Sequence, residues 1–232
     1  MAGFVRFRAG SLWGVSVMKF TLTYDGPLRS SGNKPKPKDK WDIRKKIHPQ
    51  LVDLWSSHPA LKFVEENRHF PLGTGVFLRV RHHTDPGPIP QIENLPQPTA
   101  ILDLCEDIDV HGCLFRPLVR ESHALHCGLK ILFLRKEAPG RVYQGGDIDG
   151  RIKTLMDALA MPQHETQIFA DDAEVPRPLY CLMQDDSMVS SLDVQSERLL
   201  TDENHDADYV RLVIEVDVRV RQATIYNQSF LG

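Results

Sequence analysis

Residues 209–221 (YVRLVIEVDVRVR) place the strongest constraint on the fold, because apolar and polar side chains alternate along most of the segment. A period of two puts the apolar side chains on one face of a β-strand and the polar ones on the other. Residues 18–24 (MKFTLTY) and 188–195 (MVSSLDVQ) alternate in the same way. The chain is therefore expected to contain a β-sheet with one face on a core and one in water.

A buried strand and two helices are predicted beside these alternating segments. Residues 124–135 (ALHCGLKILFLR) are mostly apolar and predict the strand. After a glycine-containing loop, a helix is predicted over about 148–160, and a second one over 41–57, where Pro49 would break or kink it. The apolar residues at helical spacing in the first helix are Ile152, Leu155, Met156 and Leu159. The expected fold class is α/β in the α+β sense, a mixed β-sheet with packed helices.

Proline-rich stretches interrupt this pattern. Residues 30–40 (SSGNKPKPKDK) alternate Pro and Lys and predict an extended loop, because proline disfavours the helical conformation of the residue before it. Residues 84–98 contain five prolines and predict a linker or surface loop. A strand is predicted over 75–81 (GVFLRVR), residues 99–119 are ambiguous, and residues 163–180 are predicted to be irregular.

Composition excludes several classes of protein. Hydrophobic residues make up 41% of the 232 residues and charged residues 25%, as in globular rather than disordered chains. No apolar run reaches the ~18 residues of a membrane-spanning helix, so no membrane partner is expected. Four scattered cysteines favour a reducing, cytoplasmic compartment. Neither a Walker phosphate loop nor a Rossmann glycine fingerprint is present, so no nucleotide cofactor is expected.

Charge is distributed unevenly along the chain. The formal net charge is −3, but residues 1–48 hold 11 Lys and Arg against 3 Asp and Glu. Such asymmetry is typical of a basic arm beside an acidic site. It is equally typical of a solvated lysine-rich loop beside an ordinary acidic surface, and charge alone favours this second interpretation.

Acidic residues around the start of the predicted helix 148–160 are the strongest candidates for chemistry. Asp147 and Asp149 are two residues apart, so in an extended chain their carboxylates point the same way and repel unless a cation lies between them. Oxygen-rich sites suit Mg²⁺ or Mn²⁺. Lys153 shares a helix face with Asp149, and Asp186 precedes a predicted strand that could lie nearby. Carboxylate-bound metal and a lysine together suit phosphodiester hydrolysis.

The same residues also have an ordinary structural interpretation. Asp147 would be favoured at a helix N-terminus by the helix dipole. Asp149 and Lys153 would form an exposed i,i+4 pair, and Asp186 would belong to a turn. On the residues alone, we favour this interpretation.

The run GGDIDGRIKTLMDAL, followed later by DDSMV, resembles the RusA family of Holliday-junction resolvases. In that family a strand and loop precede an Asp-x-Asp-Asn motif, a Lys four residues on, an Asp-Ala-Leu and an Asp-Asp-Ser. The resemblance covers residues 125–221 well and 18–35 loosely. It implies a RusA-like fold, a homodimer and metal-dependent cleavage of DNA, with branched DNA as the expected substrate. The residues it implies as catalytic are Asp147, Asp149, Lys153 and Asp186, of which the three acids would bind Mg²⁺ or Mn²⁺.

Two departures from the family pattern matter. Gly150 stands where the family has Asn, which removes an amide beside the site and weakens the start of the helix. The segment before the Asp-Asp-Ser is longer than in small family members. It contains a second acidic pair, Asp171-Asp172, which is an alternative to Asp186 as the third ligand.

The resemblance also shapes the expected domain organisation. Residues 1–17 are expected to form a flexible extension, because they lack the cleavage signature of a secretion signal. Residues 18–232 are expected to form a single RusA-like nuclease domain. Within it, residues 82–124 would be an inserted elaboration and residues 160–184 a long loop.

The basic segment near the N-terminus gains a role in this context. A nuclease needs cations to neutralise phosphates near its acidic site, and Lys and Arg supply that affinity without reading sequence. Trp41, within the segment, could stack on an exposed base, although such a residue more often anchors a helix in the core. The expected DNA-binding residues are Lys34, Lys36, Lys38, Lys40, Arg44, Lys45 and Lys46.

Two other functions remain open. The chain could be a DNA-binding module of the same fold with weakened catalysis, as Gly150 and the overall acidity suggest. It could instead be an interaction protein that recruits partners through residues 82–124. A zinc site is not favoured, because the cysteines and histidines between 105 and 127 lack a Cys-x2-Cys pair.

Overall fold

A computed structural model of the chain describes six stretches and two single positions. They are residues 15–30, 37–72, 100–136, 148–169, 176–201 and 206–222, with 227 and 230. The elements in these stretches are β1 (Val15–Pro27), α1 (Pro37–Ser57), α2 (Pro59–Glu66), β2 (His69–Leu72), β3 (Ala100–Asp103), β4 (Ile108–Val110), β5 (Cys113–Val119), η1 (Glu121–His123), β6 (Leu125–Arg135), α3 (Ile148–Leu159), η2 (Glu165–Gln167), β7 (Leu179–Met183), η3 (Asp186–Met188), β8 (Val189–Arg198) and β9 (Tyr209–Val220). These helices and mixed sheets make an α+β fold.

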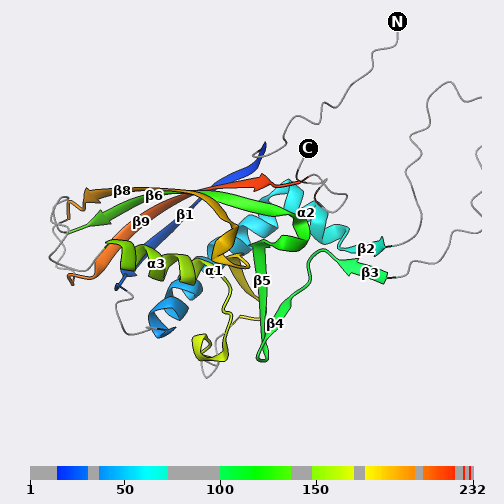
Figure 1. Ribbon diagram of the computed structural model, residues 1–232, viewed down its shortest axis with the longest axis horizontal. Helices are drawn as coiled ribbons and strands as arrows, with labels where there is room; N and C mark the ends of the chain where they lie inside the picture. Colours follow the sequence, from blue (N-terminus) through cyan, green and yellow to red (C-terminus); the bar gives the residue numbers. More distant parts are fainter. Residues whose placement is uncertain are drawn as a thin grey trace, which may run out of the picture.

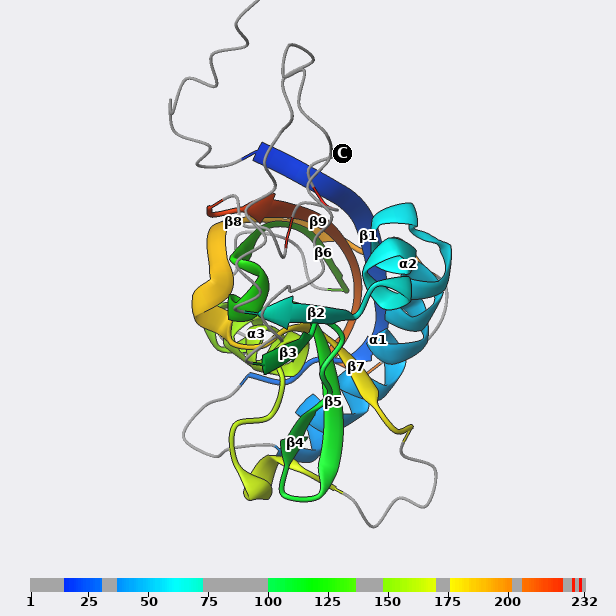
Figure 2. The same cartoon turned by 90° about the vertical axis from the view of Figure 1, so that its right-hand side faces the viewer.

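The main sheet has the strand order β1-β9-β6-β8 (Figure 1). β9 pairs antiparallel with both β1 and β6, whereas β6 and β8 are parallel. The register aligns Leu22, Ile214 and Ile131 in one row, and all three side chains are buried. Figure 2 shows the sheet as a strongly curved layer, with α1 along β1 and α3 on the side of β8. The predicted strands over 18–24, 124–135, 188–195 and 209–221 are thus confirmed as its members.

Two smaller sheets correct the prediction for the middle of the chain. β4, β5 and β7 form a three-stranded mixed sheet, and β2 pairs with β3. Phe115 of β5 is fully buried and meets Trp41 edge-on, with ring centroids 6.3 Å apart. Residues 100–124 therefore include core strands rather than only an insertion, and β7 lies inside the predicted loop 160–184. The predicted strand 75–81 lies outside the described residues.

α1 begins four residues earlier than predicted and continues through Pro49. It starts at Pro37, where proline fits well because the N–H it lacks would have no partner in the first helical turn. The helix persists to Ser57 because its apolar face is held by packing, which outweighs the local cost of Pro49. The buried apolar side chains of that face are Trp41, Ile43, Ile47, Leu51 and Trp55. Trp41 is thus a core residue, as its ordinary interpretation predicts.

No helix in the described stretches is long and apolar enough to cross a membrane. α1 is the longest of them, and it carries Lys, Arg and Asp side chains along its length.

α1 also protects the outer edge of the sheet at β1. The Gln50 side chain accepts a hydrogen bond from the Thr23 N–H (2.9 Å) and donates one to the Thr23 carbonyl (2.8 Å). Lys46 donates to the Asp25 carbonyl at 2.6 Å. These side chains take the place of a neighbouring strand, which leaves this part of the edge unable to pair with another chain.

Replacing Gln50 by alanine is expected to lower the free energy of unfolding by about 1 kcal/mol, because two backbone groups of Thr23 lose their partner. Urea unfolding measures this change, and Gln222→Ala, exposed just after β9, is the matched control. Equal effects of the two substitutions would show that the amide of Gln50 contributes no more than a surface glutamine.

Candidate active site

Asp149 and Lys153 lie on the exposed side of α3. Asp149 occupies the first turn of the helix and Lys153 follows one turn later, so the two side chains are neighbours. Both residues are exposed, whereas Leu155 and Leu159 on the opposite side are buried in the core. A carboxylate in the first turn is favoured by the helix dipole, which explains why the helix starts here despite Gly150. Asp147 lies outside the described residues.

A buried arginine fixes the orientation of α3. Arg151 is 1% exposed, and its guanidinium lies 3.4 Å from a carboxylate oxygen of Asp208, just before β9. Because Arg151 and the apolar side chains both face the core, Asp149 and Lys153 are turned toward solvent.

The Asp157 region joins α3 to α1 and lies away from the Asp149 end. Lys40 forms an ion pair with the Asp157 carboxylate at 2.5 Å. Arg44 donates hydrogen bonds to the backbone carbonyls of Asp157 (2.5 Å) and Ala160 (2.9 Å). These contacts anchor the last turn of α3, so Asp157 has a structural role.

Asp186 follows β7, and β7 ends beside the last turn of α3. After α3 the chain passes through β7 of the smaller sheet and then η3 before it enters β8, which is parallel to β6. A bridge joins Ala160, just after α3, to Met183 at the end of β7. With a rise of about 1.5 Å per residue, roughly 16 Å of helix axis separates Asp149 from Ala160. η3, which begins at Asp186, packs against α3, so Asp186 lies beside this helix.

The turn that carries Asp186 is held by its neighbour. The Asp185 carboxylate accepts a hydrogen bond from the Ser187 N–H at 2.9 Å and caps η3. Hydrogen bonds from the side chain and then the N–H of Ser187 lower the pKa of Asp185 below its usual value. Asp186 itself is exposed to solvent. The rival pair Asp171-Asp172 lies outside the described residues.

Within the described stretches, no three Asp, Glu, His or Cys side chains gather as a metal site. The Asp149 carboxylate is thus not joined there by the further ligands that a divalent cation needs, and metal ligation by Asp147, Asp149 and Asp186 remains a prediction. Four cysteines are buried free thiols, Cys105, Cys113, Cys127 and Cys181.

Most basic side chains in the described part of the basic segment form hydrogen bonds or ion pairs within the protein. Arg44 is 2% exposed and donates to carbonyls of α3, so it cannot reach a phosphate at the surface. Lys40 is paired with Asp157, Lys45 lies 3.6 Å from Asp42, and Lys46 bonds to β1. Lys38 is exposed on the first turn of α1. The two other predicted contacts, Lys34 and Lys36, lie outside the described residues.

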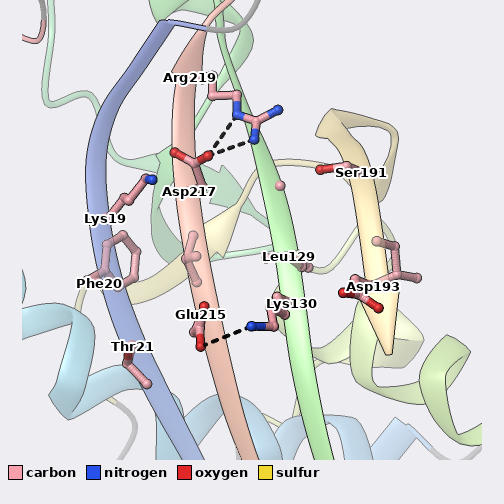
Figure 3. A pocket seen from close by; sticks show the side chains of 13 residues that line it. Lys19, Phe20, Thr21, Leu129, Lys130, Ser191, Asp193, Glu215, Asp217 and Arg219 are labelled. Atoms are coloured by element: carbon pink, nitrogen blue, oxygen red, sulfur yellow. Dashed lines mark hydrogen bonds and ion pairs between the residues drawn. The ribbon is translucent and has the colours of Figure 1, made fainter. Parts of the chain in front are cut away.

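A groove on the outer face of the main sheet was not predicted (Figure 3). Its volume is about 510 Å³. One row of its floor runs across the four strands as Lys19, Asp217, Gly128 and Ser191. Gly128 has no side chain in this row, and one would not fit without a shift, because a Cβ there would lie 2.5 Å from the Ser191 Oγ. The outward positions of the alternating strands are visible in the sequence, but which of them meet depends on a strand register that the sequence does not reveal.

Charges in the groove are balanced within the sheet. Arg219 bonds to Asp217 at 2.7 Å, and Lys130 lies 3.7 Å from Glu215. The groove therefore offers neither a basic surface for phosphates nor an acidic one for a cation.

Comparisons with protein-family models, with curated proteins and with solved structures found no match to this chain.

Proposed function

We propose that the chain is a metal-dependent endodeoxyribonuclease of the RusA kind, acting on DNA and preferentially on branched DNA. The observation that carries the proposal is the exposed Asp149–Lys153 pair at the start of α3, in a unit that runs from β6 through α3 and β7 to β8, with β6 and β8 parallel. This unit follows the order of elements in the sequence motif. Mg²⁺ or Mn²⁺ is the proposed cofactor, and a homodimer is the proposed assembly.

The proposal gives a separate role to each of the candidate residues. Lys153, which is exposed beside Asp149, is proposed to contact a phosphate oxygen of DNA. Asp149, together with Asp147 two residues earlier in the sequence, is the proposed carboxylate pair that would bind the metal. Asp186 is the third acid that the resemblance implies for the metal. Lys38, together with Lys34 and Lys36, is proposed to contact the DNA backbone.

A second candidate is a DNA-binding module without cleavage. Gly150 favours it, because it stands where the family pattern has Asn and so removes a side-chain amide beside the proposed site. This candidate predicts binding to four-way junctions with no strand scission at any level of Mg²⁺ or Mn²⁺.

The test is a cleavage assay of the purified protein on labelled four-way junction, duplex and single-stranded DNA with Mg²⁺, Mn²⁺ or EDTA. Metal-dependent nicking of the junction is expected, with a loss of at least about 100-fold in Asp149→Asn. Asp53→Asn on the exposed side of α1 is the matched control and should cut normally. Asp186→Asn, measured beside them, shows whether that acid takes part.

Each alternative result has a defined meaning. Equal cutting by wild type and Asp149→Asn would contradict the proposed site. Binding without cutting would support the binding module. Neither binding nor cutting would point to a protein partner instead of DNA.

A further inference from the structure

The two edges of the main sheet differ. The β1 edge is covered by Gln50 and Lys46 of α1. At the other edge, β8 pairs with β6 and with no other strand in the described part of the chain. Natural sheets usually block an edge strand with Pro, Lys or a covering element. β8 has ten residues (VSSLDVQSER) and contains neither Pro nor Lys, and its charged residues are Asp193, Glu197 and Arg198.

β8 also exposes apolar groups that belong to the buried face of the sheet. Leu192 continues the row of Leu129, which is buried, yet Leu192 is 46% exposed. Val194 continues the row of Ile131 in the same way and is half-buried. These apolar rows end at β8, because no described element covers the edge of β8 that faces away from β6. A further strand at that edge would bury Leu192 and Val194.

We propose that β8 pairs antiparallel with β8 of a second copy of this chain, which joins the two main sheets into one. A two-fold axis perpendicular to the sheet keeps the apolar face of one copy continuous with that of the other. Only registers that pair residues on the same face satisfy this symmetry.

The charges of β8 select among these registers. A two-fold axis at Asp193 would oppose two copies of Asp193, and an axis at Gln195 would oppose Asp193 to Glu197 twice. An axis at Val194 pairs Asp193 with Gln195 and Ser191 with Glu197, so no like charges meet. This register also uses nearly the whole length of β8, so we place the axis at Val194.

Pairing through β8 rests on the proposed function for the homodimer and assigns the surface through which the two copies meet. The pairing itself needs neither DNA nor metal. Its failure would leave the cleavage assay unchanged, and a failure of cleavage would leave the pairing unchanged.

Disulfide formation at the proposed axis tests the register directly. In Val194→Cys the two new thiols would face each other, because opposed Cα atoms in antiparallel strands lie about 4.5–5.5 Å apart, within the range of a disulfide. Mild oxidation of the native protein should give a covalent dimer. Thr21→Cys, exposed on the protected β1 edge, is the matched control and should stay monomeric. The buried native cysteines do not compete, because burial raises the pKa of Cys127 and of Cys181 to about 12.

Substitutions at Gln195 test the pairing without touching the core, because Gln195 is exposed on the outer face. Gln195→Lys would face Asp193 of the other copy twice and tighten the dimer, whereas Gln195→Glu would weaken it. The dissociation constants from sedimentation equilibrium should differ by about tenfold or more between the two variants. A wild-type chain that sediments as a monomer would overturn the proposal. So would a dimer that forms no disulfide in Val194→Cys and responds equally to both Gln195 variants.

Discussion

Replacing Arg116 by alanine is expected to lower the free energy of unfolding by about 3 kcal/mol. Arg116 is 6% exposed and makes a two-point ion pair with Asp107, at 2.7 and 3.1 Å. Its guanidinium also lies over the rings of Trp55 (5.8 Å) and Tyr180 (5.2 Å) and bonds to the Tyr180 hydroxyl. Alanine would leave the Asp107 carboxylate without its partner and open a cavity between α1, β5 and β7.

Chemical denaturation measures this effect, and two further variants define its cause. Arg211→Ala removes an equally short contact, 2.9 Å to Asp25, between two half-exposed side chains. That loss should be at most about 1 kcal/mol. Arg116→Lys keeps the charge but not the planar two-point geometry, so an intermediate loss is expected. If Arg116→Ala cost no more than Arg211→Ala, burial of the ion pair would not be the source of its strength.

Stability is expected to fall by up to about 3 kcal/mol through His123 as the pH drops from 6.5 toward 4. Burial, together with the nearby Arg120 charge, lowers the pKa of His123 from 6.5 to about 4. In that window the unfolded chain binds a proton at this histidine and the folded chain does not, so lower pH favours unfolding. Above pH 6.5 both states are neutral at His123, and its contribution to the pH dependence disappears.

His123→Phe isolates this contribution. The other buried histidines change the stability with pH equally in wild type and variant, so their effect cancels in the difference between the two. The ring of His123 packs against Phe230 with centroids 5.9 Å apart, so an aromatic replacement keeps the contact. The free energy of unfolding of His123→Phe, relative to wild type, should rise by about 3 kcal/mol between neutral pH and pH near 4. The same change at His164, which is exposed, controls for loss of a histidine. Parallel pH profiles of wild type and His123→Phe would contradict a buried neutral imidazole.

The main sheet could be predicted from the sequence because one face of its strands is exposed to solvent, which makes polar and apolar residues alternate. β9 and β1 alternate over their full length, so their apolar positions coincide with the buried rows. β5 and β7 are short and buried nearly throughout, which removes the alternation that would reveal them. The start of α1 at Pro37 was hidden because a Pro-Lys repeat also fits an extended loop.

The candidate site was predictable only in its local part. Spacing alone places Asp149 beside Lys153, because i,i+4 neighbours meet on any helix. The position of Asp186 depends on how η3 packs against α3, which no local pattern encodes. Burial of Arg44 was equally hidden, since a basic residue in a lysine-rich run resembles a surface residue until its partners on α3 are known.

The pairing of β1 with β9 sets the order in which the molecule can assemble during translation. Val15 lies opposite Val220 and Pro27 opposite Tyr209, so β1 leaves the ribosome roughly 10–40 s before its partner. β9 then enters between β1 and β6, two strands made much earlier. The nascent chain therefore cannot complete its main sheet until β9 emerges, and over that interval its unpaired apolar strands are natural clients for chaperones.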